Sequence, residues 1–72
     1  MYRYNLIRTI NIVEDLGYEV IPFKVDKKYK ASIFFREKHY LDGVLLFESH
    51  FECLKESYYK LYLKLNKENL IN

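Results

Sequence analysis

The sequence has little cysteine, proline or glycine and no tryptophan: its 72 residues include one cysteine, one proline and two glycines. The single cysteine, Cys53, has no second thiol with which to form a disulfide bridge inside the chain. Zinc would need four ligands, and His39, His50 and Cys53 supply only three, at a spacing that matches no zinc finger. We therefore expect no disulfide, no metal and no other cofactor.

Long apolar runs and a strong charge of one sign are also absent. No run approaches the roughly 18–20 residues that span a bilayer, so no membrane-spanning helix is predicted. The Met-Tyr-Arg-Tyr start is unlike a secretory signal, and together with the lone thiol this predicts a cytoplasmic protein. Twelve Lys and Arg against ten Asp and Glu leave a net charge of +2, which is too balanced to predict nucleic-acid binding from charge alone.

What is present is enough for one folded domain covering residues 1–72. Half of the residues are hydrophobic, which excludes disorder caused by low hydrophobicity and high net charge. A chain of this length buries only about 60% of the surface that its unfolded form exposes, so its core is marginal. Small domains usually compensate with disulfides, a metal or a partner. We therefore expect a partner, either a larger protein or a second copy in a homodimer.

A helix is predicted over residues 2–16, followed by a strand over residues 18–25. The helix carries an apolar stripe at helical spacing, formed by Tyr2, Leu6, Ile10, Val13 and Leu16, and Gly17 stands where a left-handed cap is expected. In the strand we expect Ile21, Phe23 and Val25 to face the core and Val20 to face away. Pro22 lacks an amide donor, which predicts an edge strand or a bulge.

A polar turn at residues 26–28 leads into a second strand over residues 29–36. Its alternation places Tyr29, Ala31, Ile33 and Phe35 inward and Lys30, Ser32, Phe34 and Arg36 outward. Two alternatives remain for the next stretch. A third strand covers about residues 40–47 with a bulge at Gly43, or the second strand runs long into a hairpin turn at Asp42-Gly43. We favour three strands.

A second helix begins after Ser49, which with Glu52 forms a capping box. Its predicted core stripe consists of Phe51, Leu54, Tyr58, Leu61 and Leu65, with Tyr62 alongside. The predicted fold is therefore α+β, in the order α-β-β-β-α, with two helices packed on one face of a small antiparallel sheet. The predicted core is Leu54, Tyr58, Leu61 and Leu65 with Ile10, Val13, Ile21, Phe23, Ile33 and Phe35.

The closing helix has a second apolar line, which is the first candidate for partner binding. At 100° per residue, Tyr59, Leu63 and Leu70 fall well outside the core stripe, and exposed apolar patches commonly mark interfaces. The sequence also has eight Tyr, a side chain that suits surfaces buried on association. We expect this line to be buried against a larger protein or a second copy.

Lysines provide an alternative binding surface. Lys24, Lys27, Lys28 and Lys30 surround the first hairpin turn, and Lys60, Lys64 and Lys67 follow one flank of the last helix. The hairpin group comes with Phe34 and Arg36, which would supply stacking for nucleic acid. The alternative binding site is thus Lys27, Lys28, Lys30, Phe34 and Arg36, and the alternative functions are a nucleic-acid-binding regulator or a self-associating structural module.

Catalysis is not expected. His50 and Cys53 are three residues apart on a helix, the smallest arrangement of a thiol nucleophile with a base, but no third residue that could orient the base is evident. Helical spacing places Cys53 on the lysine-lined flank, away from the core stripe. We therefore expect an unpaired, solvated thiol in a protein that is not an enzyme.

Two resemblances follow from these residues. The α-β-β-β-α order resembles the double-stranded-RNA-binding domain, but Phe47-Glu48-Ser49-His50-Phe51-Glu52 stands where that family has a lysine-rich helix entry, so the resemblance is one of order only. With its opening Tyr4-Asn5-Leu6-Ile7-Arg8 and closing Cys53-Leu54-Lys55-Glu56-Ser57-Tyr58-Tyr59, the chain resembles in style the short single-domain proteins of phages and mobile elements. That resemblance implies an inhibitor of the anti-defence, anti-CRISPR-like type that binds a larger host protein or complex.

Overall fold

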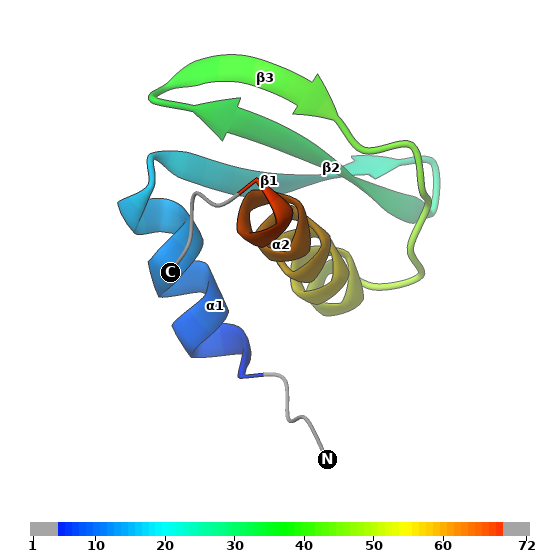
Figure 1. The fold of residues 1–72 in the computed structure, drawn as a ribbon. Coiled ribbons are helices and arrows are strands. Elements are labelled where there is room, and N and C mark those ends of the chain that lie inside the picture. The colour runs from blue at the N-terminus through cyan, green and yellow to red at the C-terminus, as the bar shows by residue number, and fades with distance from the viewer. Residues whose placement is uncertain (1–4, 69–72) are drawn as a thin grey trace.

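The computed structural model describes residues 5–68, which form two helices and a three-stranded antiparallel sheet. In chain order the elements are α1 (Leu6–Asp15), β1 (Tyr18–Val25), β2 (Lys28–Phe35), β3 (Lys38–Asp42) and α2 (His50–Lys67). The strands lie in the order β1-β2-β3, and both helices lie on one face of the sheet (Figure 1). The predicted α+β class and the α-β-β-β-α order are confirmed.

The helix α1 begins at Leu6 because Asn5 caps it: the Asn5 side chain accepts a hydrogen bond from the Arg8 amide at 3.0 Å. The predicted earlier start, with Tyr2 in the stripe, lies outside the described residues. Val13 is fully buried, and Ile10 and Leu16 pack against the core. Gly17 ends the helix in the left-handed region, with φ of 97°, as its position predicts.

The face of β1 is the opposite of the one predicted. Val20 is buried and Ile21 is 44% exposed, so Ile21, Phe23 and Val25 point away from the helices. The two-residue turn Asp26-Lys27 sets Val25 opposite Lys28 and thereby Val20 opposite Ile33. Because side chains directly opposite each other share a face, Val20 must follow Ile33 into the core. A one-residue error of phase reverses every side chain of a strand.

Pro22 lies in an edge strand, as predicted, because β1 ends the sheet. The Val20 amide does not pair with β2; it donates to the Tyr58 hydroxyl at 3.2 Å. Backbone amides alternate in direction along a strand, so the nitrogen of Pro22 also faces the outer edge. The missing donor therefore costs the sheet no hydrogen bond.

A separate third strand is confirmed, but its position differs from the prediction. The turn between β2 and β3 is made by Arg36 and Glu37, both in the left-handed region with φ of 49° and 68°. Asp42-Gly43 forms no hairpin turn, and β3 covers Lys38–Asp42 rather than residues 40–47. The register of β2 with β3 shifts between Ile33 and Phe34, so the irregularity falls earlier than Gly43.

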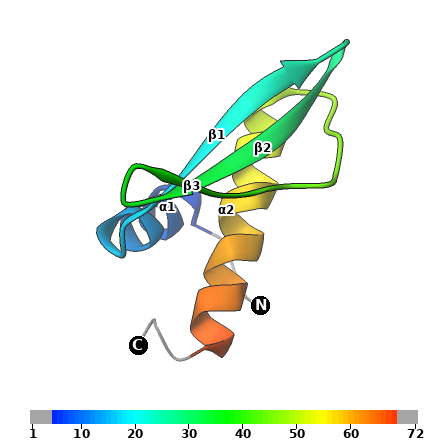
Figure 2. The ribbon, with the colours of Figure 1, turned by 90° about the horizontal axis from the view of Figure 1, so that it is seen from above.

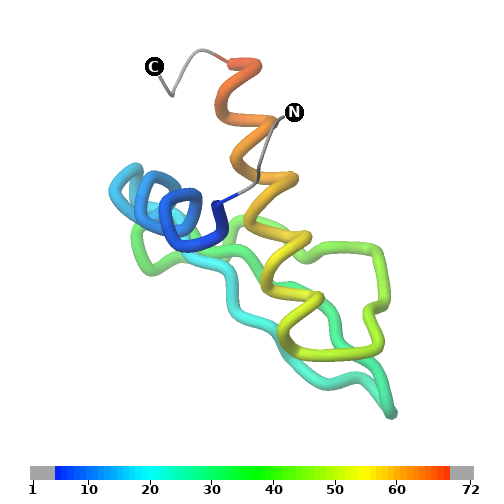
Figure 3. The backbone as a smooth tube through the Cα atoms, turned by 90° about the horizontal axis from the view of Figure 1, so that it is seen from below, coloured from blue at the N-terminus to red at the C-terminus, as the bar shows by residue number. Residues whose placement is uncertain are grey.

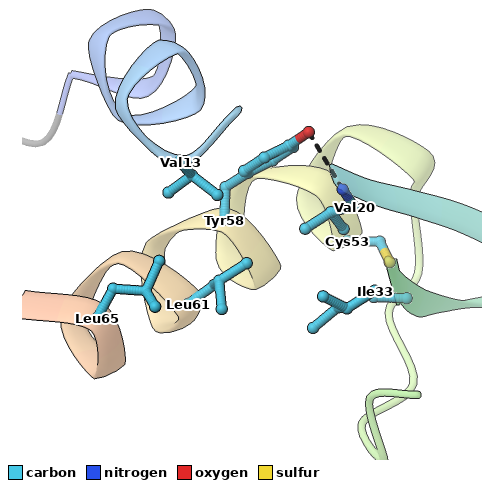
Figure 4. Close-up of a cluster of buried hydrophobic side chains, with 8 residues drawn as sticks. Val13, Val20, Ile33, Cys53, Tyr58, Leu61 and Leu65 are labelled. Carbon is cyan, nitrogen blue, oxygen red and sulfur yellow. Dashed lines mark hydrogen bonds between the residues drawn. The ribbon is translucent and has the colours of Figure 1, made fainter. Parts of the chain in front are cut away.

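The core forms where α2 packs on β1 and β2 and where α1 packs on β1 and α2 (Figures 3 and 4). Ser49 caps α2 by accepting from the Glu52 amide at 3.1 Å, as predicted. The buried apolar residues are Val13, Val20, Ala31, Ile33, Cys53, Tyr58, Leu61 and Leu65, with Ile10 and Leu54 partly buried against them. Most of the predicted core on α1, β2 and α2 is therefore confirmed.

Two predictions for α2 are wrong because the buried side of the helix is rotated from the predicted stripe. Phe51 is 60% exposed, whereas Cys53 is fully buried and Ser57 is buried. The sheet lies against the side that carries Cys53, Ser57 and Leu61. Phe51 lies about 120° around the helix from Ser57, and its side chain is therefore left uncovered. Cys53 is therefore a core residue and not a solvated thiol on the lysine flank.

Candidate functional site

The inner face of the sheet is covered by helices only in part. The helix α2 packs on β1 and β2 and reaches β3 through the long Lys64 side chain, which hydrogen-bonds Tyr40, while α1 packs on β1 and α2. The strand β3 extends beyond the helical layer (Figure 1). A pocket of about 350 Å³ lies beneath β3, beside α2. We call it the β3 groove; it is lined by Ala31, Ile33, Leu41, Asp42, Gly43, Val44, Leu45, Phe47, Ser57, Lys60, Leu61 and Lys64.

The segment after β3 leaves the sheet (Figure 2), and its apolar side chains are exposed. Gly43 donates to the Ala31 carbonyl at 2.7 Å, and Phe47 exchanges two hydrogen bonds with Tyr29, at 2.8 and 2.9 Å. Between these two attachment points β2 has one residue, Lys30, whereas the segment after β3 has three, residues 44–46. The longer segment must therefore bow outward. Val44 is 85% exposed, and Leu45 and Leu46 are also exposed. We call residues 44–46 the apolar loop.

Two lysines of α2 form the polar rim of the β3 groove. Lys64 donates to the Tyr40 hydroxyl at 3.1 Å, and its Nζ lies 5.2 Å from the centre of the Tyr40 ring. This hydrogen bond is the main reason that the pKa of Lys64 is raised above its ordinary value. Lys60 makes no hydrogen bond or ion pair with any residue of the described range 5–68. The rim is therefore positive, and one of its charges is unpaired within that range.

The predicted outer line of α2 lies apart from this groove. Leu63 is 45% exposed, as an interface residue requires, and Tyr59 is partly buried and already makes a contact within the chain. Leu70 lies outside the described residues. Neither Tyr59 nor Leu63 lines the β3 groove. Burial of this line against another chain stays a prediction.

The predicted lysine site is divided among three places. Lys28 forms an ion pair with Glu48 at 3.1 Å, while Lys30 and Phe34 lie on the outer face of β2. Arg36 is not on a strand face as predicted; it is in the β2–β3 turn, with its guanidinium 5.1 Å from the Phe35 ring. Phe34 instead meets the His39 ring edge-on at 5.7 Å.

Cys53 is buried and makes no hydrogen bond with either histidine within residues 5–68. Burial raises the pKa of the Cys53 thiol above its ordinary value, and Ser57 partly offsets this by a hydrogen bond. The His50 ring packs edge-on against Tyr29 at 5.8 Å. Within residues 5–68 no three His, Cys, Asp or Glu side chains gather as metal ligands. Over the same residues, no helix has the length and apolar character to cross a bilayer.

Comparison with known proteins gives a single result. No protein family, curated protein or solved structure matches this chain. Function is therefore inferred from the surface, where sequence reasoning missed the β3 groove. Its one signal was the apolar run Val44-Leu45-Leu46-Phe47 directly after Asp42-Gly43. We assigned that run to a strand, which would have buried alternate side chains, whereas only Phe47 returns to the sheet.

Proposed function

We propose that this protein is a small protein–protein interaction module that acts by occupying a surface of a larger protein. The observation that carries the proposal is the apolar loop, in which Val44, Leu45 and Leu46 are exposed and the first two line the β3 groove. Full burial of one such side chain contributes about 1.5–3 kcal/mol. Contiguous apolar surface of this kind commonly marks a protein interface.

The chemistry of the buried groups supports binding rather than catalysis. A thiolate is the nucleophilic form of cysteine, and the raised pKa of Cys53 keeps this side chain protonated near neutral pH. The side chain also lies inside the core, where a substrate has no access to it. In the proposed function, the protein therefore acts by binding its partner and not by covalent chemistry on Cys53.

The class of partner that we propose follows from the resemblance to small phage and mobile-element proteins. Such a protein would act in the host cytoplasm as an inhibitor or regulator, with a host protein or defence complex as its target. The marginal core of a short chain is consistent with this mode of action, because the partner would add buried apolar surface that the chain alone lacks.

Capture from a lysate with matched variants tests the proposal. We expect the natural protein to capture a partner that Val44→Glu fails to capture. The matched control is Ile7→Glu, because Ile7 is also aliphatic and is 74% exposed, but lies on α1 away from the groove. The captured protein is then purified and its binding to both variants is measured. Equal binding of Val44→Glu and Ile7→Glu would reject the apolar loop as the contact surface.

A second function is favoured by one specific observation. The corrected face of β1 places Ile21 and Phe23 on the outer sheet face beside Lys30 and Phe34, because Phe23 lies opposite Lys30 in the sheet. Aromatic and cationic side chains on an open sheet suit single-stranded nucleic acid. Fluorescence anisotropy with a labelled oligonucleotide tests this. Binding that weakens steeply with salt and is lost in Phe34→Ala supports it, whereas no binding at low salt rejects it.

A further inference from the structure

The positive rim of the β3 groove has a regular spacing. Lys60 and Lys64 line the groove, and Lys67 continues the same flank of α2 beyond it; all three are exposed. At a rise of 1.5 Å per residue, Lys64 and Lys67 lie about 6 and about 10 Å along the helix axis from Lys60. The ion pairs of the described residues involve other side chains, and Asp42, the one acid of the groove, already pairs with His39 at 2.9 Å. Lys60 therefore has no carboxylate partner within residues 5–68 and is available to a carboxylate of another molecule.

Within residues 5–68, neither helix packs its backbone against β3. Neighbouring strands lie about 4.8 Å apart, so two strand spacings approach the 8–10 Å that separates packed helices. The helix α1 lies on one side of α2, and the segment after β3 lies on the other (Figure 3). Gly43, Val44 and Leu45 of that segment line the groove. A helix placed next to α2 on that side would cover the inner face of β3 and would complete the helical layer.

The exposed edge of β3 is poorly suited to adding a strand. The strand is five residues long, it begins with Lys38, and its pairing with β2 is irregular between Ile33 and Phe34. Short length, lysine and bulges are the features by which edge strands avoid pairing with other chains. A partner that approaches this side therefore gains more from filling the groove than from extending the sheet.

Resting on the proposed function, we propose that the partner segment bound in the β3 groove is an amphipathic α-helix with an acidic flank. Its apolar side chains contact Leu41, Val44 and Leu45, the groove residues that the helices leave accessible. Its carboxylates face Lys60, Lys64 and Lys67, whose spacing of four and three residues matches that of acidic residues on one side of a helix. The groove thus selects both the shape and the charge of its partner.

Synthetic peptides test shape and charge separately. One peptide carries leucines at helical spacing with glutamates along one flank, the second has lysines in place of the glutamates, and the third is the acidic peptide with a central proline. Binding up to about 1 mM is followed by the amide NMR signals of Ile33, Leu41 and Leu61. We expect the acidic peptide to shift these signals and the other two to bind at least about tenfold more weakly. No shift with the acidic peptide, or equal binding of either other peptide, would overturn the proposal.

A charge exchange in the protein sharpens this test. Lys60→Glu with Lys64→Glu should reverse the preference, so that the lysine peptide binds more tightly than the acidic one. The control is Arg8→Glu with Lys24→Glu, which changes the net charge equally at exposed positions that line neither the groove nor the pocket containing Leu46, and it should leave the preference unchanged. If the double groove variant does not fold, Lys60→Glu alone serves, because Lys60 has no partner within residues 5–68. Equal effects of groove and control variants would assign the preference to net charge and would reject the groove.

Failure of this inference is distinguishable from failure of the proposed function. A partner that the natural protein captures and Val44→Glu does not capture, together with peptides that fail as described, leaves the binding function intact and removes the acidic helix. No difference between Val44→Glu and Ile7→Glu removes the contact surface itself.

Discussion

The inner face of the sheet has two parts that are similarly apolar but differ in whether helices cover them. Beneath β1 and β2, Val20, Ala31 and Ile33 are buried by the helices, and the polar groups there are paired. The Tyr58 hydroxyl accepts from the Val20 amide at 3.2 Å and donates to Glu14 Oε2 at 3.3 Å. Beneath β3, comparably apolar residues line an open groove and the apolar loop reaches solvent. The covered side holds the fold together, and the open side is free for recognition.

The largest decrease in the free energy of unfolding should come from a substitution that leaves a cavity on the covered side. Leu65 is 1% exposed, so Leu65→Ala should lower the free energy of unfolding by about 2–5 kcal/mol. Leu63→Ala is the matched variant two residues earlier on α2, where the side chain is exposed, and its cost should stay within about 0.5 kcal/mol. Urea denaturation of both variants measures the difference. Similar costs would show that the assigned buried side of α2 is wrong.

A smaller decrease in the free energy of unfolding is expected when only a hydroxyl group is removed from the covered side. Tyr58→Phe keeps the ring but leaves the buried Val20 amide without its acceptor, which should cost about 1–3 kcal/mol. Tyr62→Phe is the control on the same helix, since Tyr62 is only partly buried. Chemical denaturation measures both, and hydrogen exchange at the Val20 amide should accelerate in Tyr58→Phe alone. An unchanged exchange rate would contradict the role of this bond.

Alkaline pH should weaken the same side in a way that depends on Tyr58. Burial is the main cause that raises the folded-state pKa of Tyr58 above its ordinary value of 10.0, and Glu14 adds to it. The unfolded chain therefore loses this proton first as pH rises. The stabilising contribution is intact below the unfolded pKa and is lost as pH climbs towards the folded-state pKa.

The measurement is the free energy of unfolding of the natural protein and of Tyr58→Phe between about pH 9 and 11. Tyr18, Cys53 and Lys64 also have raised pKa values, so only the difference between the two proteins reports on Tyr58. We expect the natural protein to lose stability more steeply. Parallel curves would mean that Tyr58 has the same pKa in both states.

The smallest effect on stability is expected on the open side. Val44→Ala should change the free energy of unfolding by less than about 0.5 kcal/mol, because Val44 is 85% exposed. Val13→Ala removes the same atoms from a fully buried position and should cost several times more. Thermal melts of this pair compare the two regions with one chemical change. A cost for Val44→Ala equal to that for Val13→Ala would show that the apolar loop is packed rather than exposed.

The sequence by itself determined what neighbouring residues arrange among themselves. Asn5 was missed as a cap, but Ser49 with Glu52 and the left-handed Gly17 mark helix ends through bonds or angles within a few residues. The inner face of β2 was predicted correctly because apolar and polar residues alternate regularly along that strand. These features follow from local geometry, so they could be predicted without knowledge of the fold.

Only the tertiary structure decided which surfaces are covered. The inward face of β1 is set by the register that places Val20 opposite Ile33. The β2–β3 turn is made by Arg36 and Glu37, which are not the Asn-Gly pair from which such turns are predicted. The burial of Cys53, the exposure of Phe51 and the open inner face of β3 all follow from where α2 crosses the sheet. An apolar side chain carries the same local signal whether or not another element lies over it. Burial depends on contacts between residues distant in the chain, and local spacing does not encode them.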